Sequence, residues 1–428
     1  MKLLYDSLIT ITKALLPIAG VFNKKLQLGA KGRAHSWDIL DQSIKKTVPK
    51  IWVHAASLGE FEQVVPVLEK LNRENYQIVL TFFSPSGYEN KKNTTLVDTV
   101  CYLPLDTTAN ASKFVEIVEP SLAIMVKYEF WPNYLKELKK RDIKTILVSG
   151  VFRENMSFNK WYGSWMTKYL KAINHFFLQN EDSYRNLNRL GYHNARVSGD
   201  TRFDRASHLI ERDNQLDFLD RFIGDKKCLV VGSSWPEDIQ VLQKWLRENY
   251  ESGDCKVVIA PHETGSDKIK QLVGQLDDEP ILWSSLKRNQ KTLTPKSVTA
   301  LQQSNILVID TIGLFTKVYS YATIAYVGGA LGTSGLHNIL EAATYGVPVI
   351  IGKNYEKFPE AGKLEDLGGL FSVSTPDELM EIMDQLLTDD FLRDKTGMIC
   401  GHWINSNTGA TREVLNYLKQ IDEKLVIS

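Results

Sequence analysis

The chain has 428 residues, and this length predicts two to three domains. Its 51 basic residues balance its 51 acidic residues, a neutrality that argues against bulk binding of nucleic acid. The four cysteines are scattered along the chain without a metal-type pair, so we expect reduced thiols and no cysteine metal site.

The first segment, Leu3 to Phe22, predicts a helix with one apolar face. Its apolar residues recur at spacings of four and three, as Leu4, Leu8, Ile11, Leu15 and Ile18. Asp6 and Lys13 make a full bilayer crossing costly, because a crossing needs about 20 mainly apolar residues. Four basic residues follow, namely Lys24, Lys25, Lys31 and Arg33. This pattern favours a helix that lies on an anionic membrane surface, with a helix docked on the protein's own core as the alternative.

The next motif, Ile51 to Glu60, reads as a strand that runs into a helix. Ser57 and Glu60 have the spacing of a capping box, which is a purely structural explanation for both residues. Glu60 also lies at the carboxyl end of a strand, where the helix dipole is expected to favour its ionised form. An ionised carboxylate there can take a proton from an attacking hydroxyl, so capping and catalysis stay open.

Two later motifs also follow strands of the first half. Glu129 lies at the exit of a strand, followed by a turn that Trp131 and Pro132 stiffen. Arg202 is able to clamp a carboxylate or phosphate, or to pair with Asp200 or Asp204. Between these motifs, residues 158–171 interleave aromatic and basic side chains, as at a lipid headgroup interface or in a helix packed on the domain.

Alternating strands and helices fill the rest of the chain, a pattern that predicts parallel sheets with helices on both faces. The candidate strands of the first series are Ile51–Ala56, Gln77–Phe83, Val100–Pro104, Leu122–Lys127, Thr145–Gly150, His175–Gln179 and Ala195–Gly199. Those of the second series are Cys228–Gly232, Lys256–Ala260, Ile281–Trp283, Ile306–Ile309, Ile324–Val327, Pro348–Ile351 and Leu370–Val373.

A polar run from residue 207 separates the two series of strands. We therefore expect an α/β protein of three parts: a membrane-associated helix at 1–22, a Rossmann-like domain at 23–206 and a second Rossmann-like domain at 207–428. Ligands of such sheets bind at the carboxyl ends of the strands, so the expected site is a cleft between the two domains.

The second half carries the features of a nucleotide site. Ser233 and Ser234 precede a proline that suits the first position of a helix, and His262 follows another strand. After the strand Ile324–Val327, glycines from residue 328 lead into a helix start, an arrangement that favours binding of an anion. The candidate residues of this stretch are Gly328, Gly329, His337, Asn338 and Glu341, with Asn338 and Glu341 expected in the first turns of the helix.

No Asp-x-Asp tripeptide occurs in the chain, although hard-cation sites for nucleotide diphosphates usually present clustered carboxylates. We therefore expect neither a metal nor an organic cofactor. Helix N-termini and basic side chains would stabilise the leaving group instead.

Taken in order, the motifs resemble those of the 3-deoxy-D-manno-octulosonic acid (Kdo) transferases, which are GT-B glycosyltransferases of lipopolysaccharide assembly. The matching motifs are residues 55–60, 129–133, 199–204, 328–329 and 337–341. The resemblance implies transfer of Kdo from CMP-Kdo to a lipid A precursor (lipid IVA) on the cytoplasmic face of the inner membrane. We expect this transfer to be inverting and metal-independent. The resemblance also implies Glu60 as the catalytic base, and Asn338 and Glu341 as residues that hold the nucleotide.

We further expect Ser233, Ser234, His262, Gly328, Gly329 and His337 to bind the donor, and Ser57, Glu129 and Arg202 to bind the acceptor or the donor carboxylate. The chain departs from the family at Pro261–Glu263, where an arginine is missing, at Gly313-Leu314 and at Gly335-Leu336. The competing hypotheses are a nucleotide-sugar epimerase of the same two-domain architecture and a catalytically inactive binding protein.

Overall fold

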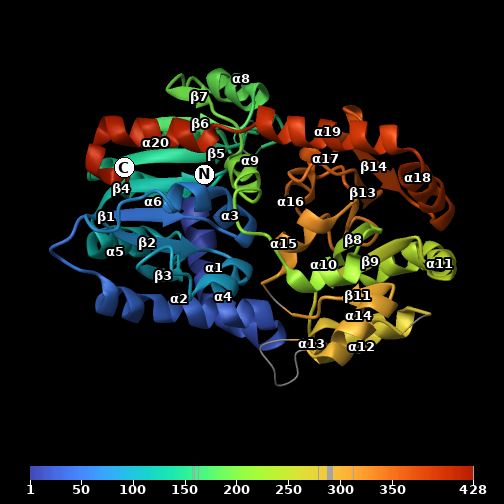
Figure 1. Cartoon of the computed structure of the whole chain (residues 1–428). Helices are drawn as coiled ribbons and strands as arrows, with labels where there is room; N and C mark the ends of the chain where they lie inside the picture. Colours follow the sequence, from blue (N-terminus) through green and yellow to red (C-terminus); the bar gives the residue numbers. More distant parts are fainter. Residues whose placement is uncertain are drawn as a thin grey trace. The chain divides into compact units, whose positions relative to one another are not determined.

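The computed structural model describes residues 1–156, 158, 160–161, 163–277, 279–286, 293–311 and 313–427, except for the side chains of 250–252. The chain forms two compact units, one of Met1–Arg205 with Asn407–Ser428 and one of Ala206–Ser406. Each contains a parallel sheet with covering helices (Figure 1). The predicted α/β fold class is therefore confirmed, while the expected cleft between the domains stays a prediction.

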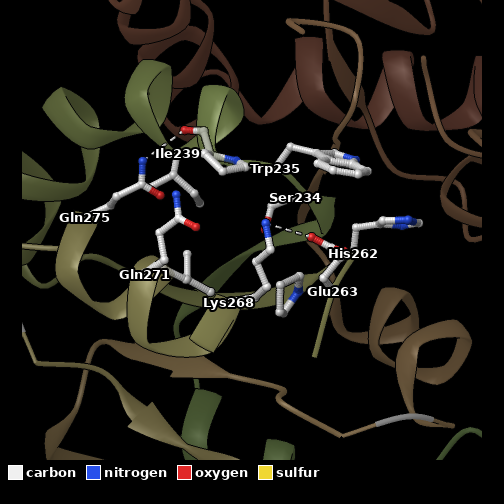
Figure 2. A pocket seen from close by; sticks show the side chains of 11 residues that line it. Ser234, Trp235, Ile239, His262, Glu263, Lys268, Gln271 and Gln275 are labelled. Atoms are coloured by element: carbon white, nitrogen blue, oxygen red, sulfur yellow. Dashed lines mark hydrogen bonds and ion pairs between the residues drawn. The ribbon is translucent and has the colours of Figure 1, made fainter. Parts of the chain in front are cut away.

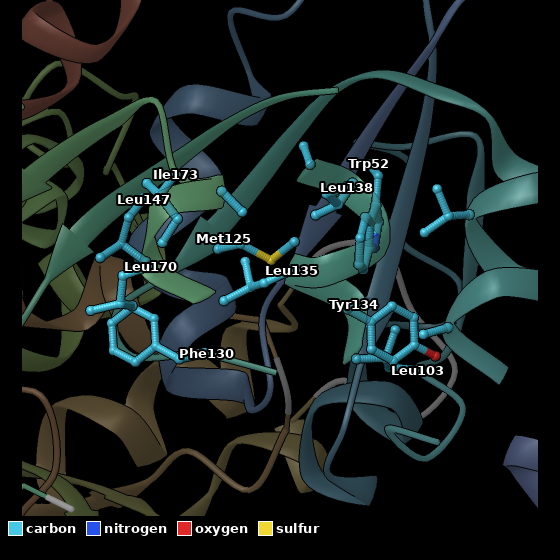
Figure 3. Packing of buried hydrophobic residues seen from close by; sticks show 14 of the residues in the cluster. Trp52, Leu103, Met125, Phe130, Tyr134, Leu135, Leu138, Leu147, Leu170 and Ile173 are labelled. Atoms are coloured by element: carbon cyan, nitrogen blue, oxygen red, sulfur yellow. The ribbon is translucent and has the colours of Figure 1, made fainter. Parts of the chain in front are cut away.

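The sheet of the first unit has the strand order β3-β2-β1-β4-β5-β6-β7. Its strands are β1 (Lys50–His54), β2 (Gln77–Phe82), β3 (Thr99–Tyr102), β4 (Pro120–Val126), β5 (Lys144–Gly150), β6 (His175–Leu178) and β7 (Ala195–Val197). Its helices include α1 (Lys2–Phe22), α2 (Lys24–Ser43), α3 (Leu58–Leu68), α4 (Pro85–Lys91), α5 (Thr108–Val118), α6 (Pro132–Lys140), α7 (Ser164–Thr167), α8 (Glu181–Arg189), α9 (Thr201–Ser207) and α20 (Ala410–Ile421). Successive residues of β1 enter different hydrophobic clusters, Trp52 on one face and Ile51 and Val53 on the other. Figure 3 shows Trp52 and Tyr134 within the first of these clusters.

The sheet of the second unit has the order β10-β11-β9-β8-β12-β13-β14. Its strands are β8 (Lys227–Ser234), β9 (Cys255–Pro261), β10 (Ile281–Leu282), β11 (Ile306–Val308), β12 (Ile324–Val327), β13 (Val349–Gly352) and β14 (Leu370–Val373). Its helices include α10 (Asp217–Ile223), α11 (Pro236–Ser252), α12 (Ser266–Gln275), α13 (Trp283–Leu286), α14 (Pro295–Gln303), α15 (Phe315–Val318), α16 (Leu340–Ala343), α17 (Pro359–Asp366), α18 (Pro376–Thr388) and α19 (Asp390–Ser406).

The last helix, α20, belongs to the first unit, whereas the sequence-based division at 206 placed the whole carboxyl terminus with the second. Val414 and Leu418 of α20 lie in the same hydrophobic cluster as β1 and β2. Asp204 accepts hydrogen bonds from the backbone nitrogen and the hydroxyl of Thr411, at 2.7 and 2.8 Å. Near the end of the chain, Val426 also forms an isolated antiparallel β-bridge with Leu71. Burial of this apolar face is the physical reason that the chain returns to its first sheet.

Helix α1 exposes the apolar face that its sequence predicts. The side chains of Leu4, Leu8, Ile11, Leu15 and Ile18 are 54–65 % exposed, so this face is not docked on the core. Among the described residues, α1 alone is long and apolar enough to cross a membrane by length and composition. Of the basic residues after it, Lys24, Lys25 and Lys31 are exposed. Arg33 instead packs 4.4 Å from the ring centre of Phe83 and donates to the Phe83 carbonyl oxygen.

Each sheet reverses its strand order at one central point. In the first unit β1 pairs with β2 on one side and with β4 on the other, and in the second unit β8 pairs with β9 and β12. Ligands of open parallel sheets bind outside the carboxyl ends of the strands at such a reversal. The segments that leave β1 and β4, and those that leave β8 and β12, are therefore the expected ligand-binding edges.

The buried Asp238 ties the two central turns of the second unit together. Its Oδ2 accepts hydrogen bonds from the backbone nitrogens of Trp235 (2.8 Å) and Gly329 (2.9 Å). Its Oδ1 accepts one from the Tyr326 hydroxyl at 3.0 Å. One carboxylate thus holds the start of α11 against the glycine turn after β12.

We predict that Asp238→Ala destabilises the protein, because it leaves three donors without their acceptor. Each such loss costs about 1–3 kcal/mol, and a total of roughly 2–5 kcal/mol is expected for the free energy of unfolding. Asp238→Asn is the matched control, since an amide oxygen still accepts from both backbone nitrogens. Urea unfolding of the three proteins measures the difference, and equal stability of the alanine and asparagine variants would contradict the assignment.

Candidate active site

Glu60 lies in the first turn of α3, directly beyond β1. Its Oε2 accepts a hydrogen bond from the Ala56 backbone nitrogen at 2.5 Å, and the Ser57 backbone nitrogen also bonds to it. Ser57 is the N-cap residue, but within the described structure its side chain makes no capping hydrogen bond. The capping box predicted from Ser57 and Glu60 is therefore only half formed, by the glutamate reaching back.

The electrostatic surroundings of Glu60 differ from the sequence-based expectation. Burial, followed by the nearby Glu129 carboxylate, raises the pKa of Glu60 to about 8, against the opposing effects of backbone donors and Lys127. The backbone donors at the helix start lower the pKa of Glu60, as expected, but desolvation outweighs their effect, so the protonated form is favoured. Glu60 is 5 % exposed, so the proton is held at a site with little access to water.

Glu129 belongs to a buried polar network beyond β4. Its Oε2 accepts a hydrogen bond from Trp131 Nε1 at 2.7 Å and lies 3.3 Å from His54 Nε2. His54 Nδ1 lies 2.8 Å from the hydroxyl of Thr81, to which Trp52 Nε1 also donates at 2.8 Å. The ring of Trp131 packs on Phe83, with centroids 4.7 Å apart. These contacts hold the Glu129 carboxylate rigidly near Glu60.

Arg202 pairs with Asp200, which is the ion-pair alternative of the sequence analysis. Its Nε and Nη2 lie 2.9 and 2.8 Å from Asp200 Oδ2. Gln63 also donates to the same carboxylate, at 3.2 and 3.3 Å. The guanidinium is therefore already matched by an internal acid.

In the second unit, the turns after β8 and β12 pack directly on each other. A Cβ on Gly328 would lie 2.5 Å from the Ser233 carbonyl oxygen and 2.6 Å from Asp238 Oδ2, so no side chain fits there. Ser233 has φ +51°, an uncommon conformation for a residue other than glycine. Gly329 has φ +99°, and a Cβ on it would lie 2.2 Å from the Gly335 carbonyl oxygen. The structure thus brings Ser233, Gly328 and Gly329 together at the strand reversal.

Three rings lie next to one another beside these turns, with one stacked and one tilted pair. The rings of Trp235 and His262 lie 4.6 Å apart at 23°, and those of His262 and His337 lie 4.5 Å apart. Burial, followed by His262, lowers the pKa of His337 to about 4, and burial lowers the pKa of His262. Trp235 Nε1 donates to His337 Nε2 at 3.3 Å, which assigns the proton of the neutral His337 ring to Nδ1. Each imidazole is then a neutral group with one N–H to donate.

Asn338 and Glu341 contact each other, but not as two residues of one helix. Helix α16 begins only at Leu340, and the Asn338 side-chain oxygen accepts from the Leu340 backbone nitrogen at 3.2 Å. Asn338 Nδ2 donates to Glu341 Oε1 at 3.2 Å. The prediction that Asn338 lies in the first helical turn was therefore wrong, since it precedes the N-cap residue Ile339.

His54, Trp235 and Asp238 were not among the functional residues predicted from the sequence. Asp238 stands three residues after the capping position at Trp235, a spacing that signals an N-terminal cap. Nothing in the local sequence marks His54, because its partner Glu129 lies 75 residues away. Within the described part of the chain, no group of three or more His, Cys, Asp or Glu side chains is placed to hold a metal ion.

Comparison with known proteins shows which enzymes this chain resembles. Residues 27–205 match the family model of the 3-deoxy-D-manno-octulosonic-acid transferases. The chain is 28 % identical to 3-deoxy-D-manno-octulosonic acid transferase of Haemophilus influenzae, over 88 % of both chains. It is 26 % identical to the enzyme of that name from Aquifex aeolicus, over 81 % of this chain and 88 % of that one.

The fold is also similar to that of solved structures. A putative UDP-N-acetylglucosamine 2-epimerase from Listeria monocytogenes superposes with a TM-score of 0.58 at 14 % identity, covering 88 % of this chain and 97 % of that one. At that identity the likeness shows the two-domain fold alone. The sequence relatives and the family model together confirm the resemblance seen in the motifs: this chain is a glycosyltransferase similar to the Kdo transferases of lipopolysaccharide biosynthesis.

Proposed function

We propose that this glycosyltransferase moves Kdo from CMP-Kdo to a lipid A precursor, lipid IVA, with inversion at the anomeric carbon. The observation that carries the proposal is the position of Glu60. It is a buried carboxylate beyond β1, at the strand reversal of its sheet, and its pKa is raised to about 8. Such a carboxylate is poised to accept a proton near neutral pH.

In the proposed step, the ionised Glu60 takes the proton of an acceptor hydroxyl. The acceptor oxygen forms a bond to the anomeric carbon of Kdo as the bond from that carbon to the phosphate oxygen breaks. CMP leaves with the bonding electron pair. Burial and, after it, Glu129 keep the pKa of Glu60 high, and a stronger base is a better proton acceptor once it is ionised. Ser57 stands next to this carboxylate as a candidate contact for the acceptor.

The donor nucleotide is assigned to the second unit. Asn338 and Glu341 are proposed to hold the ribose and base, since their side chains lie together after the glycine turn. Ser233 is proposed to bind the phosphate, with His262 and His337 as neutral N–H donors. Gly328 and Gly329 shape the turn beside it, since their backbone nitrogens already donate to Gly232 and Asp238. Charge on the leaving phosphate is then stabilised by hydrogen bonds rather than by a metal ion.

The acceptor carries acyl chains, so the enzyme must meet it at a membrane surface. We place α1 on the inner membrane at its cytoplasmic face, as a surface helix. Polar contacts tie α1 along the first unit: the Tyr5 hydroxyl donates to Asp106 at 2.8 Å and Asn133 donates to Asp6 at 3.0 Å. A helix held in this way leaves its apolar face free for lipid, whereas a perpendicular crossing would place these polar groups in hydrocarbon.

The aromatic and basic residues at 158–171 adjoin this helix in part. Trp165 packs on Tyr5 with ring centroids 5.5 Å apart, and Trp161 is 82 % exposed. Lys160, Lys168 and Lys171 are exposed, whereas Phe158 is buried in the core. Tyr162, also part of the predicted run, lies outside the described residues. The exposed members are proposed to add a salt-sensitive attraction to anionic lipid.

We predict that Glu60→Gln lowers the rate of Kdo transfer by ~10²–10⁴-fold, because an amide accepts no proton at neutral pH. The kcat/KM of the unaltered enzyme should rise with pH through about 8, as Glu60 loses its proton. Glu129→Gln removes a repelling charge and should lower the pKa of Glu60. The rise of kcat/KM should then occur at lower pH. Glu116→Gln, at an acid that is 72 % exposed, is the control and should leave the pH dependence of kcat/KM unchanged.

Mass spectrometry of the lipid product, in assays that contain EDTA, measures these rates and tests metal independence together. Near-normal turnover of Glu60→Gln would return Glu60 to a capping role. Loss of transfer in EDTA that magnesium restores would exclude the metal-independent mechanism.

We predict that Glu341→Ala weakens CMP binding by roughly 1.5–3 kcal/mol, the cost of losing hydrogen bonds to a charged group. Isothermal titration of CMP into the folded variant is the measurement. Glu356→Ala, at an exposed acid of the same unit, is the control and should bind CMP normally. Unchanged affinity in Glu341→Ala would remove Glu341 from the nucleotide site.

We predict that the double variant Leu8→Glu, Ile11→Glu sediments less with anionic vesicles at every salt concentration, because it removes apolar contact with lipid. Charge reversal at Lys160, Lys168 and Lys171 should weaken only the salt-sensitive part of vesicle binding, by about 1 kcal/mol for each positive charge removed. Both variants should titrate CMP normally, which controls for folding. If the double variant binds vesicles as well as the unaltered protein, α1 is not the membrane contact.

A further inference from the structure

A pocket of the second unit lies beside the Trp235–His262 ring pair (Figure 2). It is lined by the end of β8, the end of β9 and one side each of α11 and α12. Its apolar side is formed by Ile239 and Leu272, both buried. Its polar groups include Ser234, Lys268 and Gln271. With a volume of about 30 Å³, the pocket suits one small charged group of a ligand rather than a whole ligand.

The side chain of Ser234 is evidence for such a ligand. The residue is 5 % exposed, and within the described structure its hydroxyl has no hydrogen-bond partner. Buried hydroxyls are normally paired, so a native unpaired one calls for a partner that is missing. The hydroxyl has a donor and two acceptor sites available on the wall of the pocket.

Lys268 supplies a cation at the same place. Its Nζ lies 3.2 Å from Glu263 Oε2, and both side chains are about half exposed, at 52 % and 48 %. Ion pairs this exposed contribute little, so an incoming anion can replace Glu263 as the partner of the ammonium. In Figure 2 the Lys268 side chain extends toward Ser234. A ligand anion can therefore meet the ammonium and the unpaired hydroxyl together.

We propose that this pocket binds the carboxylate of the donor sugar, with Lys268 as its cation and Ser234 as its hydrogen-bond donor. The proposal rests on the proposed function, in which the donor is a nucleotide ester of a sugar acid. Arg202, the sequence-based candidate for this role, is matched by Asp200. The carboxylate adjoins the anomeric carbon that bears the phosphate, and the pocket adjoins the proposed phosphate contacts through Ser234 and His262. Lys268 thereby selects a sugar acid over a neutral sugar.

The test compares CMP with CMP-Kdo on four proteins. For Lys268→Ala we expect the KM for CMP-Kdo to rise about tenfold, as for loss of a charged hydrogen bond, with CMP affinity unchanged in titration. Lys268→Arg should recover most of the loss. Lys270→Ala is the matched control, because Lys270 is an exposed lysine of the same helix that does not line the pocket.

The outcomes separate the alternatives. Equal weakening of CMP and CMP-Kdo in Lys268→Ala would reassign Lys268 to the phosphate and overturn the proposal. An unchanged KM in Lys268→Ala, with normal transfer by the unaltered enzyme, would overturn it while leaving the proposed function intact. If the unaltered enzyme binds CMP but transfers no Kdo, the proposed function itself fails, and this inference fails with it.

Discussion

The pairing of strands at the centre of each sheet is the constraint on which the candidate site depends. Because β1 lies between β2 and β4, and β8 between β9 and β12, the connections leaving the central strands depart in opposite directions. This separation leaves room beyond the carboxyl edge for Glu60 and Glu129 in one unit, and for two close turns in the other. The packing of Gly328 against Ser233, and the hydrogen bonds of Asp238, then hold those turns in one arrangement.

Burial is the second determinant, since it sets the chemical state of the groups that those edges carry. Two carboxylates in a poorly solvated site cannot both ionise easily, and the proton therefore stays on Glu60 up to about pH 8. The same effect keeps His337 and His262 neutral, so they offer N–H groups rather than charges. Lys268 and Glu263, by contrast, remain half exposed and free to exchange partners.

The amino-terminal helix connects the site to its surroundings. The Tyr5 hydroxyl reaches Asp106, and Asp106 also accepts hydrogen bonds from the backbone nitrogens of Asn133 and Tyr134 at the start of α6. That helix start follows directly on the segment that carries Glu129. One network of hydrogen bonds therefore joins the exposed apolar helix to the loop beside the candidate base.

The sequence by itself determined the two series of parallel strands, the motifs at their carboxyl ends and the apolar face of α1, because each of these is encoded in local periodicity and turn residues. The exposure of that face was decided by the tertiary structure. Only the tertiary structure decided the return of α20 to the first sheet, the pairing of Arg202 with Asp200 and the raised pKa of Glu60. Each of these depends on which distant side chains are brought together, and on how much water they exclude. The spacing of residues along the chain does not show which distant side chains meet or how far water is excluded from them.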